Sequence, residues 1–181
     1  MIKVNAVMTD GTEEAELLNV VDILKRAGAD VKLVSVAGKT ITSSHGIVLT
    51  ADSTLHDTDL TDCDLLFVPG GMPGSKSLGE NKSLIAAIAG MLKSGKKVAA
   101  ICAAPALVLG RNGFLKGRKA TCFPGFEENM VGAEVTGARV EVDGNIITAR
   151  GLGCAIELGL ELVALLFDRV KSDEIKTKIQ F

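Results

Sequence analysis

The residues best placed to do chemistry surround one cysteine. Cys102 follows a short apolar run, residues 98–101, and a turn signal at residues 94–96 precedes that run. This pattern predicts a buried strand. Pro105 suits the first turn of a helix, where its missing N–H is not needed. We therefore expect the thiol at a sharp strand-to-helix turn, which is the geometry of a nucleophile elbow.

A thiol in that position has a chemical use. The start of a helix carries partial positive charge and free N–H groups, so it favours thiolate over thiol, and the thiolate is the nucleophile. Ala100, Ala103 and Ala104 are small, as a tight elbow requires. The alternative is that Cys102 is a small buried core residue, as most free cysteines are. The local pattern alone gives these two interpretations about equal weight.

Acidic residues open the first predicted helix. Glu13, Glu14 and Glu16 fall in its first turn, after the turn at residues 9–12, where Asp10 or Thr12 would cap it. All three acids could simply favour the helix N-terminus.

A glycine pair follows another predicted strand. Residues 64–68 form a buried apolar run that leads directly into Pro69-Gly70-Gly71. Glycines at the end of a strand let the backbone approach a ligand closely, and in an open α/β sheet ligands bind at that end. The alternative is that the glycines only form a tight turn.

Composition restricts the class of protein. The chain has 181 residues, of which 47% are apolar and 23% charged, so we expect one well-buried domain. The net charge is −2 and Lys and Arg form no cluster, which argues against nucleic acid as a partner. No apolar run is long enough to span a membrane, and the N-terminus shows no secretory pattern. These features predict a cytoplasmic protein that does not bind membranes.

The cysteines predict separate thiols rather than a scaffold. They are Cys63, Cys102, Cys122 and Cys154. They form no Cys-x-x-Cys pair, so we expect neither a disulfide framework nor a zinc site. Cys122 is predicted to be a packing residue, and Cys63, between two aspartates, a surface thiol.

Strand and helix patterns alternate along nearly the whole chain. Strands are predicted at residues 2–8, 31–36, 64–68, 98–101 and 119–123, and hairpins at 38–49 and 140–148. Helices are predicted after residue 12 up to 27, and at 81–93, 102–112, 155–167 and 172–180, with an irregular connection at 52–62. The alternation predicts a mostly parallel sheet with helices on both faces, but not the order of its strands.

Four motifs in order resemble a known family. They are Gly11-Thr12-Glu13-Glu14-Ala15-Glu16, Val68-Pro69-Gly70-Gly71, Ala100-Ile101-Cys102-Ala103-Ala104-Pro105 and Arg150-Gly151-Leu152-Gly153. Together they resemble the ThiJ/PfpI superfamily, in the branch of the parkinsonism-associated protein deglycase (DJ-one). The resemblance covers essentially the whole chain, and the elbow and the Pro-Gly-Gly turn are its most specific parts.

The resemblance implies a fold and a site. The fold would be a flavodoxin-like three-layer α/β sandwich, a single domain over residues 1–181 of the class I glutamine amidotransferase type, assembled as a homodimer. Cys102 would be the reactive thiol, and Glu16 would share a proton with it. N–H groups of Gly71 and Ala103, with Gly70 in the same turn, would form an anion pocket. A carboxyl group beside a thiolate should have a raised pKa.

The chain departs from the family pattern at three positions. Related intracellular peptidases carry a His where this chain has Ala103, so protease activity is disfavoured. Many deglycase relatives carry a His in the segment that contains Phe123, so the acid–base role is left to Glu16. Some relatives carry an Arg near the dimer contact where this chain has His45.

We expect an enzyme that needs no cofactor and no metal. It would be a glyoxalase III-type hydro-lyase or protein deglycase that acts on methylglyoxal-type dicarbonyls or on glycated protein side chains, with a role in the oxidative-stress response. The second hypothesis is a redox-sensing thiol protein or chaperone without significant turnover, since an activated thiol is also readily oxidised. The third is an interaction protein whose elbow has lost its chemistry.

Overall fold

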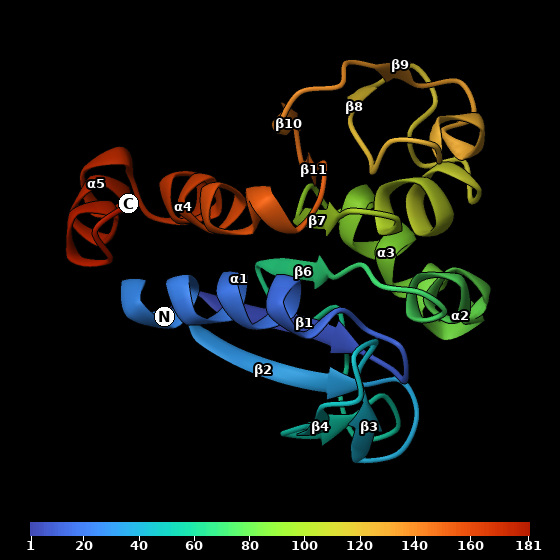
Figure 1. Ribbon diagram of the computed structural model, residues 1–181, viewed down its shortest axis with the longest axis horizontal. Helices are drawn as coiled ribbons and strands as arrows, with labels where there is room; N and C mark the ends of the chain where they lie inside the picture. The colour runs from blue at the N-terminus through green and yellow to red at the C-terminus, as the bar shows by residue number, and fades with distance from the viewer.

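The computed structural model describes residues 1–181 and contains a central seven-stranded sheet (Figure 1). Its strands are β1 (Lys3–Met8), β2 (Asp30–Ser35), β5 (Ser53–Thr54), β6 (Leu65–Val68), β7 (Lys97–Ile101), β10 (Val140–Asp143) and β11 (Ile146–Ala149). Their order across the sheet is β10-β11-β7-β6-β1-β2-β5. Every neighbouring pair is parallel except β10 and β11. The predicted mostly parallel sheet is confirmed.

Helices cover both faces of this sheet. On one face lie α1 (Glu14–Ala27), α4 (Ala155–Leu166) and α5 (Arg169–Lys178). On the other lie α2 (Gly74–Glu80), α3 (Lys82–Lys93) and the π-helix η1 (Pro105–Gly110). Short 3₁₀ helices, η2 (Glu127–Asn129) and η3 (Leu152–Cys154), complete the set. The three-layer α/β sandwich is therefore confirmed. None of the helices combines the length and the apolar character needed to cross a bilayer.

Alternation along the central strands builds two cores. In β6, Leu65 and Phe67 pack into the core under α1 and α4, whereas Leu66 and Val68 pack into the core under α3 and η1. All four side chains are fully buried. A strand covered on both faces has no polar side, which is why the sequence shows continuous apolar runs here. The result is a rigid sheet whose carboxyl edge can hold a site.

Both predicted hairpins are present. One joins β3 (Thr40–Thr42) to β4 (Val48–Thr50), and the other joins β10 to β11 through Asp143 and Gly144. The predicted left-handed end of the first helix is also confirmed, because Gly28 has φ +95°. The cap at the start of that helix was predicted wrongly. Glu13, not Asp10 or Thr12, is the N-cap, and its side chain accepts a hydrogen bond from the N–H of Glu16.

The predicted strand at residues 119–123 is wrong for most of its length. Only β8 (Lys119–Ala120) forms, and it pairs with β9 (Glu134–Val135) outside the main sheet. The backbone after Ala120 makes other hydrogen bonds. The N–H of Thr121 donates to the side chain of Thr148, and the N–H of Phe123 donates to the Cys102 carbonyl. This segment therefore lies against the cysteine elbow. The helix predicted at 102–112 is shorter, since only η1 forms there. The predicted irregular connection at 52–62 contains the short strand β5, and α2 was not predicted.

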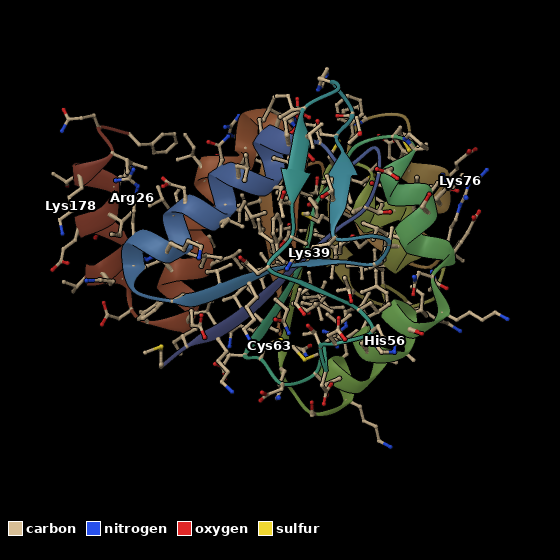
Figure 2. The ribbon with its side chains drawn as sticks, turned by 90° about the horizontal axis from the view of Figure 1, so that it is seen from below. Arg26, Lys39, His56, Cys63, Lys76 and Lys178 are labelled. Carbon is tan, nitrogen blue, oxygen red and sulfur yellow. The ribbon has the colours of Figure 1, made fainter.

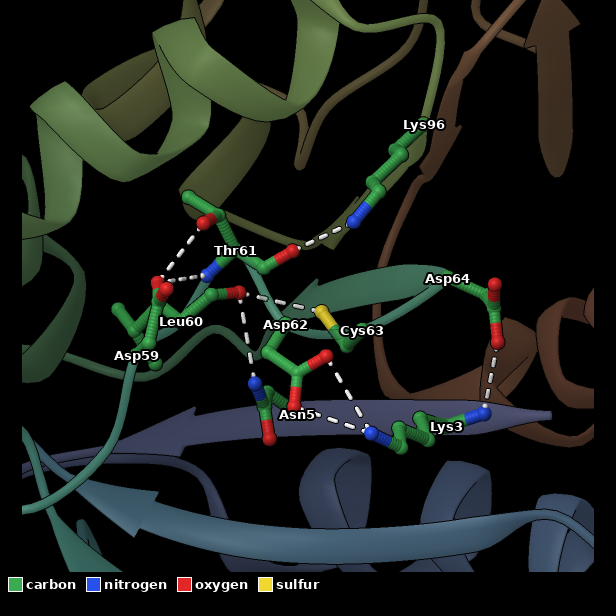
Figure 3. A network of polar contacts seen from close by, with 9 residues as sticks. All are labelled: Lys3, Asn5, Asp59, Leu60, Thr61, Asp62, Cys63, Asp64 and Lys96. Atoms are coloured by element: carbon green, nitrogen blue, oxygen red, sulfur yellow. Dashed lines mark hydrogen bonds and ion pairs between the residues drawn. The ribbon is translucent and has the colours of Figure 1, made fainter. Parts of the chain in front are cut away.

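Cys63 is buried rather than exposed, which corrects the sequence-based prediction. Its thiol donates to the Leu60 carbonyl oxygen at 3.1 Å, and burial raises its pKa to about 11 (Figure 3). The flanking aspartates face outward instead: Asp62 pairs with the Lys3 ammonium at 3.0 Å, and Asp64 accepts the Lys3 N–H at 2.8 Å. The chain bends at residues 62–64, before β6 begins, and Cys63 turns inward there while its two charged neighbours are exposed.

Candidate active site

The four family motifs meet at one edge of the sheet. They follow β1, β6, β7 and β11, which are neighbours in the order β11-β7-β6-β1 and run parallel. Parallel strands bring their carboxyl ends to the same edge, which is where ligands bind in open α/β sheets. The sheet order, which the sequence did not give, therefore assembles the candidate site.

Cys102 forms the predicted elbow. Its φ is +66°, in the left-handed region that side-chain-bearing residues rarely adopt. Backbone hydrogen bonds hold it on both sides: its N–H donates to the Ala149 carbonyl at 2.9 Å, and its carbonyl accepts the Phe123 N–H at 2.8 Å. The residue is half-buried. Its surroundings thus fix a strained turn that keeps the sulfur accessible.

Gly70 lies in direct contact with both predicted reacting groups. A Cβ at this position would collide with Glu16 Oε2 and lie 2.6 Å from Cys102 Cβ. Its N–H donates to Glu16 Oε2 at 3.0 Å, so it serves the carboxyl group rather than the predicted anion pocket. Gly71 has φ +95°, and a Cβ there would collide with the backbone of Glu13. Both glycines are therefore needed for close approach and not only for a turn.

Glu16 is almost completely buried, with 1% of its surface exposed. Burial raises the pKa of its carboxyl group to about 7, and the negative charge of Glu13 adds to this effect. Hydrogen bonds with the Cys102 thiol and with the N–H groups of Gly70 and Leu152 act in the opposite direction. The pKa is raised as predicted, but burial and Glu13 raise it rather than a neighbouring thiolate. Near neutral pH this group is present in both protonation states, as a proton-transfer catalyst requires.

The thiol of Cys102 does not have the low pKa expected from its position at a helix start. Burial raises its pKa to about 12, and so do the charge and the hydrogen bond of ionised Glu16. The N–H groups of Ala103 and Gly71 oppose this by hydrogen bonding to the sulfur. The partial charge at a helix start acts locally, whereas burial of the thiol and the charge of the Glu16 carboxylate arise from tertiary contacts and change the thiol pKa more. At neutral pH the thiol therefore keeps its proton, and the ionised fraction of Glu16 can accept that proton from the thiol.

The structure brings together the other predicted site residues. The N–H groups of Gly71 and Ala103 both point at the sulfur, where they could hold a developing oxyanion. Leu152 was missed as a functional residue. Its N–H holds the Glu16 carboxyl group, and the only sequence signal was the Arg150-Gly151-Leu152-Gly153 motif, to which no role was attached.

An ion-pair cluster lies beside the site. The His45 Nδ1 atom is 2.9 Å from Glu14 Oε1 and 3.8 Å from Glu13 Oε1. Burial would raise the pKa of Glu14, but hydrogen bonds from its own N–H and from Ser43, with the attraction of protonated His45, lower it. Because Glu13 already caps α1 and Glu14 already bonds His45, we interpret the cluster as a hydrogen-bonded network rather than a metal centre.

Gly70→Ala should destabilise the protein by about 1–3 kcal/mol, because the added methyl group cannot fit between Glu16 and Cys102. Gly90→Ala is the matched control. A Cβ there would meet only Thr61 Cγ2 at 3.6 Å, and alanine favours the helix, so this variant should be neutral or slightly stabilised. Urea unfolding measures both. Equal stabilities for the two variants would contradict the close packing at Gly70.

Glu13→Gln should lower the pKa of Glu16. The amide oxygen can still cap α1, but the negative charge that opposes ionisation of Glu16 is removed. The carboxyl carbon of Glu16, followed by NMR, should titrate near pH 7 in the parent and at lower pH in the variant. Glu14→Gln removes an equal charge that does not contribute to the raised pKa of Glu16, so it should leave the midpoint nearly unchanged. A parent midpoint near pH 4.5 would overturn this account.

Comparisons with known proteins agree with this architecture. Residues 2–165 match the DJ-1/PfpI family. Protein DJ-1 homolog A of Arabidopsis thaliana is 40% identical over 170 residues, which make up 92% of this chain and 43% of that protein. The chain thus spans less than half the length of this relative. A deglycase of Thermococcus kodakarensis is 32% identical over 167 residues, covering 91% of this chain and 99% of the relative.

The fold comparison extends over the whole chain. The solved structure of oxidized Toxoplasma gondii DJ-1 superposes with a TM-score of 0.96 at 32% identity, and the match covers 100% of this chain and 99% of that one. The strand order, the elbow and the sequence matches lead to one conclusion: the chain is a member of the DJ-1/PfpI family.

Proposed function

We propose that the protein is a cofactor-independent, cysteine-dependent enzyme that converts methylglyoxal-type 2-oxo aldehydes to hydroxy acids, or removes their adducts from protein side chains. The observation that carries this proposal is a buried carboxyl group hydrogen-bonded to a half-exposed thiol, with two N–H groups at the same sulfur. Relatives named as deglycases, such as that of Thermococcus kodakarensis, support the reaction class.

The first step is attack of Cys102 Sγ on the aldehyde carbon. The S–C bond forms as the thiol proton passes to the Glu16 carboxylate and the C=O π bond breaks. The negative charge that develops on the aldehyde oxygen falls where the N–H groups of Gly71 and Ala103 can bind it. Glu16 then gives its proton to that oxygen, which produces a hemithioacetal and restores the Glu16 carboxylate.

The second step moves a proton between neighbouring carbons. Glu16 removes the proton from the carbon that bears sulfur, and the electron pair moves to the adjacent carbonyl oxygen to give an enediolate. Glu16 returns this proton to the adjacent carbon, while the hydroxyl proton on the sulfur-bearing carbon passes to the neighbouring oxygen. The product is a 2-hydroxy thioester. Water then cleaves the thioester, which releases the hydroxy acid and restores the thiol. A carboxyl group with a pKa of about 7 suits both the removal and the return of the proton.

The acid–base role has no second candidate beside the sulfur. Phe123 occupies the segment where an imidazole was considered, and its ring packs against Gly151. Ala103 follows the cysteine, so no Cys-His dyad of the peptidase type forms there. We therefore assign proton transfer to Glu16 alone. The homodimer that the family resemblance implies stays a prediction, and so do the single-domain organisation and the cytoplasmic location.

Cys102→Ser and Glu16→Gln should each lower hydroxy acid formation at least about 100-fold, because one removes the nucleophile and the other the proton acceptor. Cys122→Ser is the control, since Cys122 is a buried packing thiol with its pKa raised to about 11. Lactate formed from methylglyoxal, quantified by NMR, is the measurement. Lactate is preferable to loss of methylglyoxal, which any thiol or amine can capture. Unchanged lactate formation by Cys102→Ser would refute the mechanism.

A second candidate function is redox sensing. The half-exposed sulfur of Cys102 lies beside a carboxyl group and two N–H groups, all of which can hydrogen-bond a sulfinate. A solved relative is itself described as oxidized DJ-1 of Toxoplasma gondii. One equivalent of peroxide would convert the thiol to sulfenate, and a second would give sulfinate.

Mild peroxide should therefore add two oxygens to Cys102 before any other thiol reacts. The three remaining cysteines are each no more than 4% exposed and serve as internal controls. Peptide mass spectrometry after a peroxide series locates the oxygens. Oxidation spread evenly over the four thiols would count against a specialised redox site.

A further inference from the structure

An open pocket of about 400 Å³ adjoins the candidate active site, and the proposed mechanism does not use it. Its lining includes Phe123, Leu152, Arg139 and Arg150. Arg150 and Leu152 come from the loop after β11, Phe123 comes from the segment that packs against the elbow, and Arg139 directly precedes β10. The pocket therefore combines apolar walls with two guanidinium groups.

Three contacts join this pocket to the reacting groups. The N–H of Leu152 hydrogen-bonds the Glu16 carboxyl group. The N–H of Phe123 donates to the Cys102 carbonyl at 2.8 Å. A Cβ on Gly151 would lie 3.2 Å from the Phe123 ring, so these two walls are in contact. A substrate held at Cys102 thus has the pocket as its nearest neighbour on this side.

The two arginines differ in their partners. Arg139 is occupied, since it pairs with Glu157 at 2.6 Å and donates to the Gly153 carbonyl at 2.7 Å. Arg150 makes no ion pair and has only one long hydrogen bond, 3.4 Å, to the Gly137 carbonyl. One uncommitted guanidinium group therefore remains beside the site. A planar guanidinium with free N–H groups is the preferred partner of a carboxylate.

The apolar walls indicate the rest of the ligand. The Phe123 and Leu152 side chains are 46% and 48% exposed, which is high for residues of this size. They suit a carbon chain that runs from the sulfur toward Arg150. A second pocket, near Met72, also contains a cation, Arg111, but Glu128 lies in its lining and Arg111 is bonded to Asn129 at 2.7 Å. That pocket is less suited to an anion.

We propose that Arg150 forms a subsite for the carboxylate end of a 2-oxo aldehyde substrate whose aldehyde reacts at Cys102. The inference rests on the proposed function and narrows its substrate class. One guanidinium group can hold a carboxylate through two parallel N–H···O bonds. Arg150 is then a specificity-determining residue that takes no part in proton transfer.

The test uses two substrates that differ by one charge: a short-chain 2-oxo aldehyde that ends in a carboxylate, and its primary amide. We expect the parent to favour the carboxylate in kcat/KM by roughly three- to tenfold, as for a partly exposed ion pair. In Arg150→Gln the ratio should fall to about one, with little change for the amide. Arg150→Lys should keep part of the preference, and added salt should reduce it in the parent.

Two control variants separate the subsite from general charge effects. Arg26→Gln removes the same charge from α1 and should keep the parent ratio. Figure 2 shows Arg26 at the end of the molecule opposite Lys76 of α2. Arg111→Gln tests the pocket near Met72 and should also keep it. An unchanged ratio in Arg150→Gln, or a lost ratio in either control variant, would overturn the proposal.

A measurement that needs no turnover distinguishes failure of the subsite from failure of the proposed function. Cys102 is alkylated with two N-substituted iodoacetamides, one ending in a carboxylate and the other in a primary amide. The parent should react relatively faster with the carboxylate reagent than Arg150→Gln does. If neither aldehyde is turned over but this difference persists, the proposed function fails and the subsite stands. If the difference is absent, the subsite is refuted whatever the turnover.

Discussion

The contact between the buried carboxyl group of Glu16 and the sulfur of Cys102 is the interaction on which the site depends. Folding raises the pKa of Glu16 from 4.5 to about 7, so ionising it costs the fold about 3 kcal/mol. The protonated group stabilises the fold fully below pH 4.5, and this contribution is lost as pH rises through 7. Above pH 7 the protein therefore holds a carboxylate that burial opposes. The N–H groups of Gly70 and Leu152 offset part of that cost.

Only a rigid scaffold can hold such a contact. Cys102 sits at φ +66°, and its backbone is held by Ala149 and Phe123. Gly70 leaves no room for a side chain between sulfur and carboxyl. The strands that carry these loops are buried on both faces, so their ends cannot shift without disturbing two cores. Local strain at the cysteine is thus balanced by packing elsewhere in the sheet, which explains why four separate loops must converge.

Much of this arrangement could be predicted from sequence, because certain residue types are obligatory at certain positions. An apolar run before Cys102 and a proline after it predict an elbow, and paired glycines predict close approach. The N–H of Leu152 could not be predicted, since a backbone donor has no characteristic residue type. The burial of Cys63 and the high thiol pKa of Cys102 also depend on tertiary neighbours. In both cases local sequence favoured the opposite result.

The structure also separates reaction from selection. Loops after β1, β6 and β7 supply the acid, the N–H groups and the thiol, whereas the loop after β11 and the segment around Phe123 form the neighbouring pocket. An imidazole at Phe123 would have added a second base beside the sulfur. The phenyl ring instead adds an apolar wall. In the proposed mechanism this leaves proton transfer to Glu16, and in the proposed subsite charge recognition to Arg150. Substitutions in the pocket can therefore change which substrate is preferred without altering the contact that performs the chemistry, because the two share only backbone groups.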